Sequence, residues 1–516
     1  MAWLLRINRI YGEDENLAVA SRFARAFAGG QGDPAVSESQ VSRWEHATAR
    51  AGAAVIRRYE RVLGLEDGRI GAVAHSLYRE SLGRLGPPVL RPPANPDDEV
   101  LRRRRLSRLL ERALGDEEMT GADWAELTEG VWAIPLLLHP ASLWDQLAVR
   151  LLAEMLIAEG TAWLNRCEAI NRLLGHRDST ESVIEACTEI IDDHRSQVLI
   201  EPMALLELTP HPAAARHLLR HIEHPGGGHA LRAAWWAVAE KAGRGHFSPE
   251  QLRCLTRTAA ETLRDNGSHM ACRLAAAETA RQVMPAAATA SLRHALGKAS
   301  KDDPVTGHVV RSGTTCAPAT VWAIARNLSG ATLIAMPREL LHRDPILERL
   351  IASMLFHPQG TRRVITAQAI AATPYRWALA AAISRELGRS ATLANAALAT
   401  ALVQALTHLG GPGEAPLVRR LALSTGLPAP ISESAAWVAG HLPGEDSAFW
   451  SSAVRRIVLE DAEPCLAKGL VYSLGTARRH DELRALAGTA RLHPDLRTAA
   501  GWWLTIPGVI SRSACS

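Results

Sequence analysis

A short polar segment between residues 37 and 43 carries the side chains best suited to recognition chemistry. Ser37 can cap a helix through its side-chain oxygen, and Gln40 can return a hydrogen bond in the capping-box arrangement. The side chains that this helix would offer to a partner are polar: Ser37, Glu38, Ser39, Gln40, Ser42 and Arg43. They can donate and accept hydrogen bonds to base edges in the major groove of double-stranded DNA, where each base pair shows a distinct donor and acceptor pattern.

The other side of the same predicted helix is apolar. Val41 and Trp44 are three residues apart on one side of the helix, where we expect them to pack inward with Val36. The helix would therefore rest on a small core and keep its polar side free.

The ten residues Val-Ser-Glu-Ser-Gln-Val-Ser-Arg-Trp-Glu, 36–45, resemble the recognition helix of the Cro/C1 (Xre) helix-turn-helix family. The segment 55–65, which ends in Leu-Gly-Leu, is similar to the closing helix of that family. The resemblance implies a five-helix bundle that binds operators in double-stranded DNA, commonly as a homodimer. Position by position, it places Glu38, Ser39 and Gln40 at base contacts and Ser42 and Arg43 at bases or backbone phosphates.

The N-terminal segment also departs from the family pattern. The stretch Gly-Gly-Gln-Gly-Asp-Pro, 29–34, makes a longer connection between the two predicted helices than the family has. Residues 1–86 hold twelve arginines and ten acidic residues, a net charge of only +2, so non-specific affinity for phosphates should be weak unless the protein dimerises. The alternative is a helix-turn-helix fold that serves only as a protein-interaction module.

The composition indicates a large, intracellular protein with local contacts to any nucleic acid. The chain has 516 residues, 47% of them hydrophobic, and a net charge of +4, which excludes the global basic field of a histone-like protein. Its seven cysteines are odd in number and form no Cys-x-x-Cys pair, so we expect reduced thiols and no thiolate zinc site.

We find no signal peptide and no apolar stretch near the ~20 residues that span a bilayer, and we expect a cytoplasmic protein without membrane contacts.

A proline-rich stretch divides the chain. Five prolines between residues 87 and 96 rule out a helix or a central strand there. The sequence therefore predicts a helix-turn-helix domain over 1–86, a semi-rigid linker over 87–97 and a second region over 98–516.

The second region has a helical pattern almost throughout. Stretches rich in alanine, leucine and arginine predict helices from Asp97 to the end of the chain, and we expect no sheet. Among the predicted helices are 142–158, 213–222, 231–242, 249–263, 269–283, 286–296, 347–355, 392–409, 448–459 and 496–504. The fold class is therefore all-α, a helix-turn-helix bundle followed by a long helical array.

The array shows faint internal repetition. The dipeptide His-Pro recurs where one predicted helix ends and the next begins, at residues 139, 211, 357 and 493. The segments 229–240 and 493–504 resemble the second helix of a HEAT repeat, which favours a HEAT- or TPR-like solenoid. A non-repetitive helical domain is the alternative.

The remaining constellations favour structural roles. The histidines at 217, 221 and 224 have a spacing that could present imidazoles to one metal ion, but an exposed helical face explains them better. The same holds for the four arginines at 102–105, which could add phosphate contacts beside the linker, and for the tryptophan pairs 235–236 and 502–503, which could line a groove. We find no Walker loop, no His-Glu-x-x-His and no Gly-x-Ser-x-Gly motif, so we expect no enzyme, no cofactor and no metal.

These observations predict a transcriptional regulator. The N-terminal domain would read a DNA sequence, and the helical array would sense a peptide, a protein or a small molecule, or would dimerise. The rival interpretation is a non-catalytic scaffold or adaptor, for example in stress or phage-defence signalling, whose helix-turn-helix domain binds protein.

Overall fold

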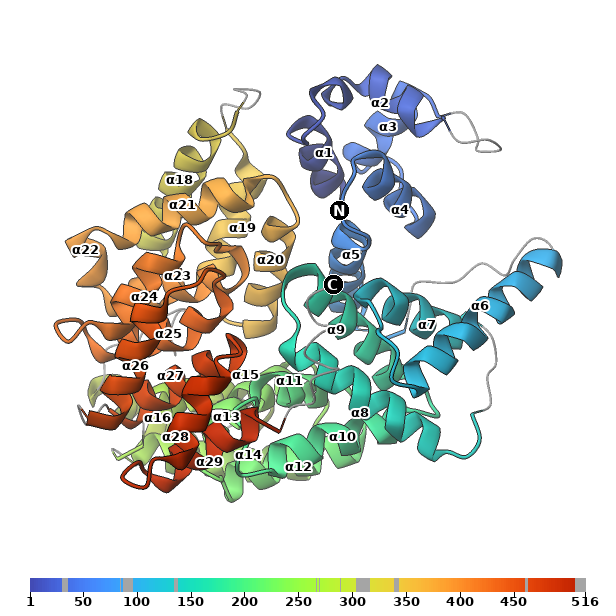
Figure 1. The fold of residues 1–516 in the computed structure, drawn as a ribbon. Helices are drawn as coiled ribbons and strands as arrows, with labels where there is room; N and C mark the ends of the chain where they lie inside the picture. Colours follow the sequence, from blue (N-terminus) through green and yellow to red (C-terminus); the bar gives the residue numbers. More distant parts are fainter. Residues whose placement is uncertain are drawn as a thin grey trace.

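The computed structural model of the chain is all-helical in the part that it describes, which contains no strand (Figure 1). The structure describes residues 1–29, 36–83, 85–86, 96–133, 138–265, 267–268, 270–287, 289–302, 316–337, 343–459 and 463–505. The all-α fold class expected from the sequence is confirmed. No described helix combines the length and the apolar character that crossing a bilayer requires.

The first helices form the N-terminal bundle, which lies at one end of the molecule (Figure 1). Its elements are α1 (Ala2–Ile10), the 3-10 helix η1 (Glu15–Ala18), α2 (Ala20–Phe27), α3 (Glu38–Glu45), α4 (Ala53–Val62) and α5 (Arg69–Leu82). A cluster of aromatic rings fills its core. Phe27 contacts Trp44 and Tyr59 at ring-centroid distances of 5.6 and 5.4 Å, and Phe23 lies 4.7 Å from Tyr59.

The rest of the chain forms two arrays of helices, which we call the first and second arrays. The first array comprises α6 (Pro96–Leu114), α7 (Gly121–Ala133), α8 (Ser142–Ile157), α9 (Gly160–Gly175), α10 (Thr180–Asp192), α11 (Ile200–Leu208), α12 (Pro212–Glu223), α13 (Gly228–Gly243), α14 (Pro249–Arg264), α15 (Met270–Ala287) and α16 (Ala290–Asp302). The second comprises α18 (Pro318–Ile334), α19 (Pro345–Phe356), α20 (Gly360–Ala371), α21 (Tyr375–Leu387), α22 (Ser390–Leu393), α23 (Ala396–Leu409), α24 (Ala415–Leu423), α25 (Ala429–Val438), the 3-10 helix η2 (Ala439–His441), α26 (Ser447–Leu459), α27 (Pro464–Thr476), α28 (His480–Gly488) and α29 (Pro494–Trp503).

Within each array, helices contact their neighbours and the helix after next. In the first array, α13 packs against α11, α12 and α15, and α14 packs against α15 and α16. In the second, α25 packs against α23, α24 and α27, and α27 packs against α29. A regular HEAT- or TPR-like repeat stays a prediction.

Two of the four His-Pro dipeptides mark helix starts, whereas the helices after His139 and His357 begin later, at Ser142 and Gly360. His211 and His493 are N-caps whose ring Nδ1 accepts a hydrogen bond from the backbone N–H two residues on, at 3.4 and 3.3 Å, with proline in the first helical turn. The predicted helix over 392–409 is wrong as one element, since Asn395 caps a new helix, α23, through its side-chain oxygen. The predicted helix over 286–296 is also divided, because α15 continues to Ala287 and α16 starts at Ala290.

The N-terminal bundle does not stand apart from the arrays. Ile7 and Ile10 of α1 and the following Tyr11 belong to the same buried cluster as the second array. Trp3 donates a hydrogen bond to Asp344 at 2.8 Å through its ring nitrogen. The bundle therefore shares a core with helices more than 300 residues away in sequence. Of the predicted linker 87–97, only Pro96 and Asp97 lie within the described residues, and they begin α6.

Helix α5 joins the bundle to both arrays. Ser76 and Arg79 donate hydrogen bonds to the buried carboxylate of Glu168 in α9, each at 2.7 Å. The next residue, Glu80, accepts from Arg244, which directly follows α13, at 3.0 Å and from Arg362 of α20 at 3.3 Å. The first half of α5 completes the bundle core, and the second half is held where the two arrays meet.

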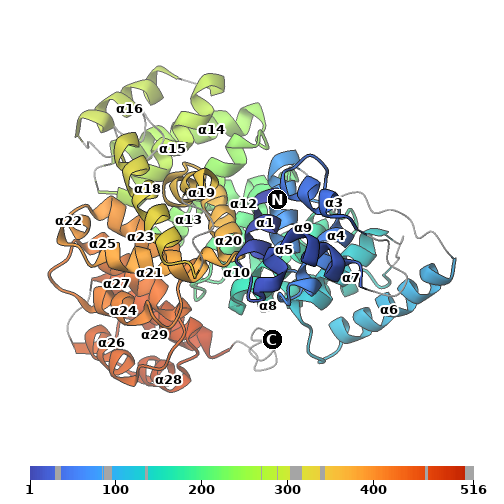
Figure 2. The same ribbon diagram turned by 90° about the horizontal axis from the view of Figure 1, so that it is seen from above.

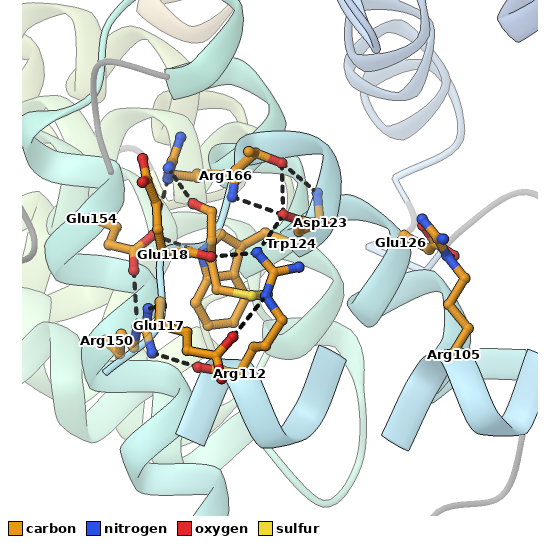
Figure 3. A network of polar contacts seen from close by, with 12 residues as sticks. Arg105, Arg112, Glu117, Glu118, Asp123, Trp124, Glu126, Arg150, Glu154 and Arg166 are labelled. Atoms are coloured by element: carbon orange, nitrogen blue, oxygen red, sulfur yellow. Dashed lines mark hydrogen bonds and ion pairs between the residues drawn. The ribbon is translucent and has the colours of Figure 1, made fainter. Parts of the chain in front are cut away.

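A polar network fixes the start of the first array (Figure 3). The guanidinium of Arg150 in α8 donates to the backbone carbonyls of Arg112 and Ala113, at 2.9 and 3.1 Å, and so closes the carbonyl end of α6. The buried carboxylate of Glu154 accepts from Arg150, from Arg166 and from the ring nitrogen of Trp124. These contacts join α6, α7, α8 and α9 into one unit.

One tryptophan of each pair is buried and the other is half-buried. Trp235 is fully buried in the first array, and Trp236 lies against Gly360 at the start of α20. Trp503, at the end of the second array, donates to Gln197, between α10 and α11 of the first array, at 2.9 Å. These rings pack helices together.

Candidate nucleic-acid interface

Helix α3 begins where the sequence predicts. Ser37 is its N-cap, with extended backbone, and its side-chain oxygen accepts a hydrogen bond from the backbone N–H of Gln40 at 3.3 Å. The predicted return bond is wrong, because the side-chain oxygen of Gln40 accepts from the guanidinium of Arg43 instead. The Ser37 half of the capping box is therefore present. The Gln40 half is replaced by a contact with Arg43, so two of the predicted DNA-binding residues contact each other.

The predicted reading side of α3 is open to solvent. Of the six candidate residues, Gln40 is half-buried and the others are exposed: Ser37, Glu38, Ser39, Ser42 and Arg43. No described part of the two arrays covers them. In both ribbon views α3 lies on a part of the bundle that is turned away from the second array (Figures 1 and 2).

The inner side of α3 is held by the bundle core. Val41 is fully buried and Trp44 nearly so. The indole of Trp44 lies 6.2 Å from the Tyr59 ring, in an edge-on arrangement, and against Phe27 of α2. These contacts set the roll of the helix about its axis, so the polar side chains face outward together.

A buried ion pair fixes α3 against α1. Arg9 of α1 and Glu45 of α3 form two hydrogen bonds, each 2.7 Å long, and their side chains are almost wholly buried. The hydroxyl of Tyr59 in α4 donates to the same carboxylate at 3.3 Å. Burial and the neighbouring Glu45 carboxylate raise the pKa of Tyr59, so the phenol stays protonated and keeps this bond.

A second buried carboxylate positions α5. Glu60, near the end of α4, accepts hydrogen bonds from the backbone N–H groups of Gly68, Ile70 and Gly71, at 3.3, 2.6 and 2.8 Å. Burial raises the pKa of Glu60, and the three bonds to the charged form act against that shift. A carboxylate at the N-terminus of α5 also satisfies its unpaired donors.

Sequence reasoning missed these structural residues, and the reason is physical. Arg9, Glu45, Tyr59 and Glu60 are polar types that usually lie at the surface, and only their partners make burial favourable. Of these four residues, only Arg9 has a sequence position that could have indicated burial, because it lies between the apolar Ile7 and Ile10 in α1.

Two exposed arginines of the N-terminal bundle lie beside other elements than α3. Arg50, which follows α3, is exposed, and its guanidinium lies 5.7 Å from the centroid of the Tyr78 ring. Arg57 of α4 is also exposed and lies 3.7 Å from Glu129 of α7. The connection at residues 30–35, which the sequence marks as unusually long, lies outside the described residues.

The other histidine and arginine candidates have different surroundings. Among the histidines at 217, 221 and 224, Nε2 of His221 lies 3.0 Å from Asp192, which also accepts from Arg220 at 2.6 Å. Within the described residues, no group of three or more His, Cys, Asp or Glu side chains has the geometry to hold a metal ion. The arginines at 102–105 lie on α6.

The chain matches no family model, no curated protein and no solved structure. The resemblance of residues 36–45 to the Cro/C1 family therefore stays a prediction that depends on those residues.

Proposed function

We propose that the protein is a sequence-specific DNA-binding transcriptional regulator. Helix α3 is the element that enters the major groove, with Ser37, Glu38, Ser39, Gln40, Ser42 and Arg43 as its DNA-binding residues. The observation that carries this proposal is a short helix whose polar side is exposed while its apolar side and its last residue are anchored in a core.

The exposed side chains have the right chemistry for this role. Arg43 can bind a guanine edge through two donors, and Gln40 can do the same with an adenine edge. Their mutual hydrogen bond holds both side chains in place on successive turns, which lowers the entropy lost on binding. Ser39 and Ser42 are short enough to allow the helix to approach the bases closely.

The helical arrays supply the regulatory part of the proposal. We infer that a peptide, a protein or a small molecule binds the arrays, or that the arrays hold two copies of the chain together, with α1 and α5 carrying the effect to α3. Trp3, Asn8 and Arg79 tie these two helices to the arrays, so a rearrangement of the arrays would turn the bundle as a whole. A ligand could act in this way only by binding one arrangement better than another.

Selection of bound fragments from genomic DNA tests the proposed function. The full chain should enrich a common sequence, and Arg43→Ala and Gln40→Ala should each lower affinity for that sequence by about 10- to 100-fold, because each lost base contact costs about 1–3 kcal/mol. Electrophoretic shift at fixed salt measures the change. Arg253→Ala on α14, an exposed arginine far from α3, is the matched control and should bind as the unaltered chain does.

Two results would count against the proposal. One is recovery of fragments without any shared sequence. The other is equal affinity of the unaltered chain and both α3 variants for the enriched sequence. Capture of a protein by the α3 surface, lost in Arg43→Ala, would instead support the scaffold.

A further inference from the structure

Helix α6 carries a strongly basic surface outside the N-terminal bundle. Residues 100–110 of this helix contain five arginines and no acidic residue. Both ribbon views show that the first half of α6 projects from the body of the molecule, on the side where α3 and α4 lie (Figures 1 and 2). This surface is a candidate for binding an extended polyanion.

Packing determines which arginines face outward. Leu106, Leu109 and Leu110 are buried against the rest of the first array, so the opposite side of α6 is presented to solvent. Arg104 and Arg108 are exposed there, four residues apart and therefore on neighbouring turns of one face. The structure gives neither of them an ion pair with a described carboxylate, whereas Arg103 pairs with Glu99 at 2.8 Å and Arg105 pairs with Glu126.

Contacts through α7 connect this surface with the bundle. Glu126 of α7 pairs with Arg105 of α6, and Glu129, three residues later, lies 3.7 Å from Arg57 of α4. Residues three apart are neighbours on a helix surface, so α4 and α6 approach the same stretch of α7 from two directions. The exposed arginines of α6 therefore lie beside the bundle that presents α3.

We propose that Arg104 and Arg108 bind the phosphate backbone of double-stranded DNA that runs beyond the segment read by α3. This inference rests on the proposed function and adds a second, sequence-independent contact to it. Arginine suits phosphate because its guanidinium donates two parallel hydrogen bonds and stays charged. The contact also offsets the low charge of the bundle, since two further phosphates neutralised by α6 increase affinity at every sequence equally.

Binding of two DNA lengths tests this inference. The full chain and the double variant Arg104→Ala/Arg108→Ala are titrated with a duplex confined to the selected sequence and with one extended on both sides, over a series of salt concentrations. On the extended duplex, the double variant should bind about 10-fold more weakly or worse at 0.1 M salt, and its slope of log affinity against log salt should fall by about 2. On the short duplex the two proteins should bind equally.

The matched control has the same spacing on another helix. Arg253 and Arg257 are exposed and four residues apart on α14, which lies away from α6 in both views (Figures 1 and 2). Arg253→Ala/Arg257→Ala should leave affinity and slope unchanged on both duplexes. This control separates a local contact from a general effect of net charge.

Each remaining outcome overturns the inference. If the unaltered chain binds the selected sequence but the α6 variant shows the same affinity and slope on the extended duplex, the α6 contact is wrong and the role of α3 stands. If the α6 variant loses the same affinity for the short and the extended duplex, Arg104 and Arg108 do not contact DNA beyond the selected sequence. If the unaltered chain has no sequence preference at all, the proposed function fails first and the α6 contact fails with it.

Discussion

Buried charges in the N-terminal bundle have a positioning role. Glu45 is the last residue of α3 and accepts hydrogen bonds from α1 and α4, through Arg9 and Tyr59. One carboxylate therefore joins three helices at the end of the proposed reading helix. Desolvation makes such a pair a weak source of net stability, but removal of one partner leaves the other charge buried and unpaired.

Glu45→Ala should loosen α3 more than any change on its outer side. We expect the free energy of opening of α1 and α3 to fall by about 3–5 kcal/mol, as is typical when one partner of a buried pair is lost. Hydrogen exchange of the α1 and α3 amides measures this local opening in the full chain.

The control removes both charges of the same pair. Arg9→Met/Glu45→Leu replaces the pair by apolar groups of similar size and should recover most of the lost protection. Equal protection in Glu45→Ala and the unaltered chain would show that the pair does not hold α3.

Carboxylates also gather where the two arrays meet. Burial raises the pKa of Glu278 in α15 to about 7, the Arg363 guanidinium acts in the opposite direction, and the Glu240 carboxylate adds to the rise. Burial raises the pKa of Glu207 and Glu240 as well. These groups face the start of α20, so their protonation bears on the contact between the arrays.

The sign of the pH effect follows from the raised pKa. Between pH 4.5, the pKa of Glu278 in the unfolded chain, and about pH 7, the folded chain keeps the Glu278 proton and the unfolded chain does not. The contribution of this group to the free energy of unfolding is therefore fully present below pH 4.5 and is lost as the pH rises through 7. Glu278→Gln should remove this loss, which is worth up to about 3 kcal/mol. The difference in unfolding midpoint between variant and unaltered chain, measured from pH 4.5 to 8, should grow with pH.

An exposed glutamate provides the comparison for this pH dependence. Glu250 is exposed in the first turn of α14, and Glu250→Gln, measured over the same pH range, is the matched control for replacing a glutamate. A flat difference for Glu278→Gln would contradict the raised pKa.

Among the elements, the start of α20 depends on one glycine. A Cβ added at Gly360 would lie 2.0 Å from the ring nitrogen of Trp236 in α13, closer than atoms can approach. Only glycine lets the first turn of α20 rest on this indole, beside Thr361, which donates to Glu207 of α11 at 2.9 Å.

Gly360→Ala should therefore destabilise the contact between the arrays. We expect a loss of about 1–3 kcal/mol from overpacking, measured by thermal or denaturant unfolding. Gly330 lies inside α18 with open space around it, so Gly330→Ala should have the opposite sign and stabilise the chain by about 0.5–1 kcal/mol. Stability changes of the same sign in both variants would contradict the close contact.

Local signals predict the elements well where caps and periodicity agree. The Ser37 cap and the inward side chains Val41 and Trp44 lie as predicted, and α14 starts at Pro249 behind the capping residue Ser248. The break before α23 was missed, because the alanine-rich run on both sides of Asn395 favours helix throughout. A single capping side chain outweighed that preference.

Across the whole molecule, the contacts that matter most join residues far apart in sequence. Trp3 donates a hydrogen bond to Asp344, and Trp503 donates one to Gln197. Periodicity reports only which side of a helix is apolar and carries no information on which other helix covers it. The sequence therefore predicts an N-terminal domain and an array, but the docking of α1 and α5 on both arrays could not be foreseen.

This docking bears on how regulation would work. The sequence predicted a separate N-terminal domain joined by a semi-rigid linker at 87–97, whereas α1 and α5 share buried contacts with the arrays. On our proposal, DNA affinity would then depend on the arrangement of the arrays, and the changes at Gly360 and Glu278 would alter it without touching α3.

The central claim is that the outer side of α3 distinguishes one DNA sequence from another. Its most direct test is the ratio of dissociation constants for the enriched duplex and a scrambled duplex of equal length, at one salt concentration. We predict that the unaltered chain binds the enriched duplex at least about 1,000-fold more tightly, and that Arg43→Ala reduces this preference while binding to the scrambled duplex changes little. A ratio near one for the unaltered chain, or an undiminished ratio for Arg43→Ala, would contradict the assignment of α3 as the reading helix.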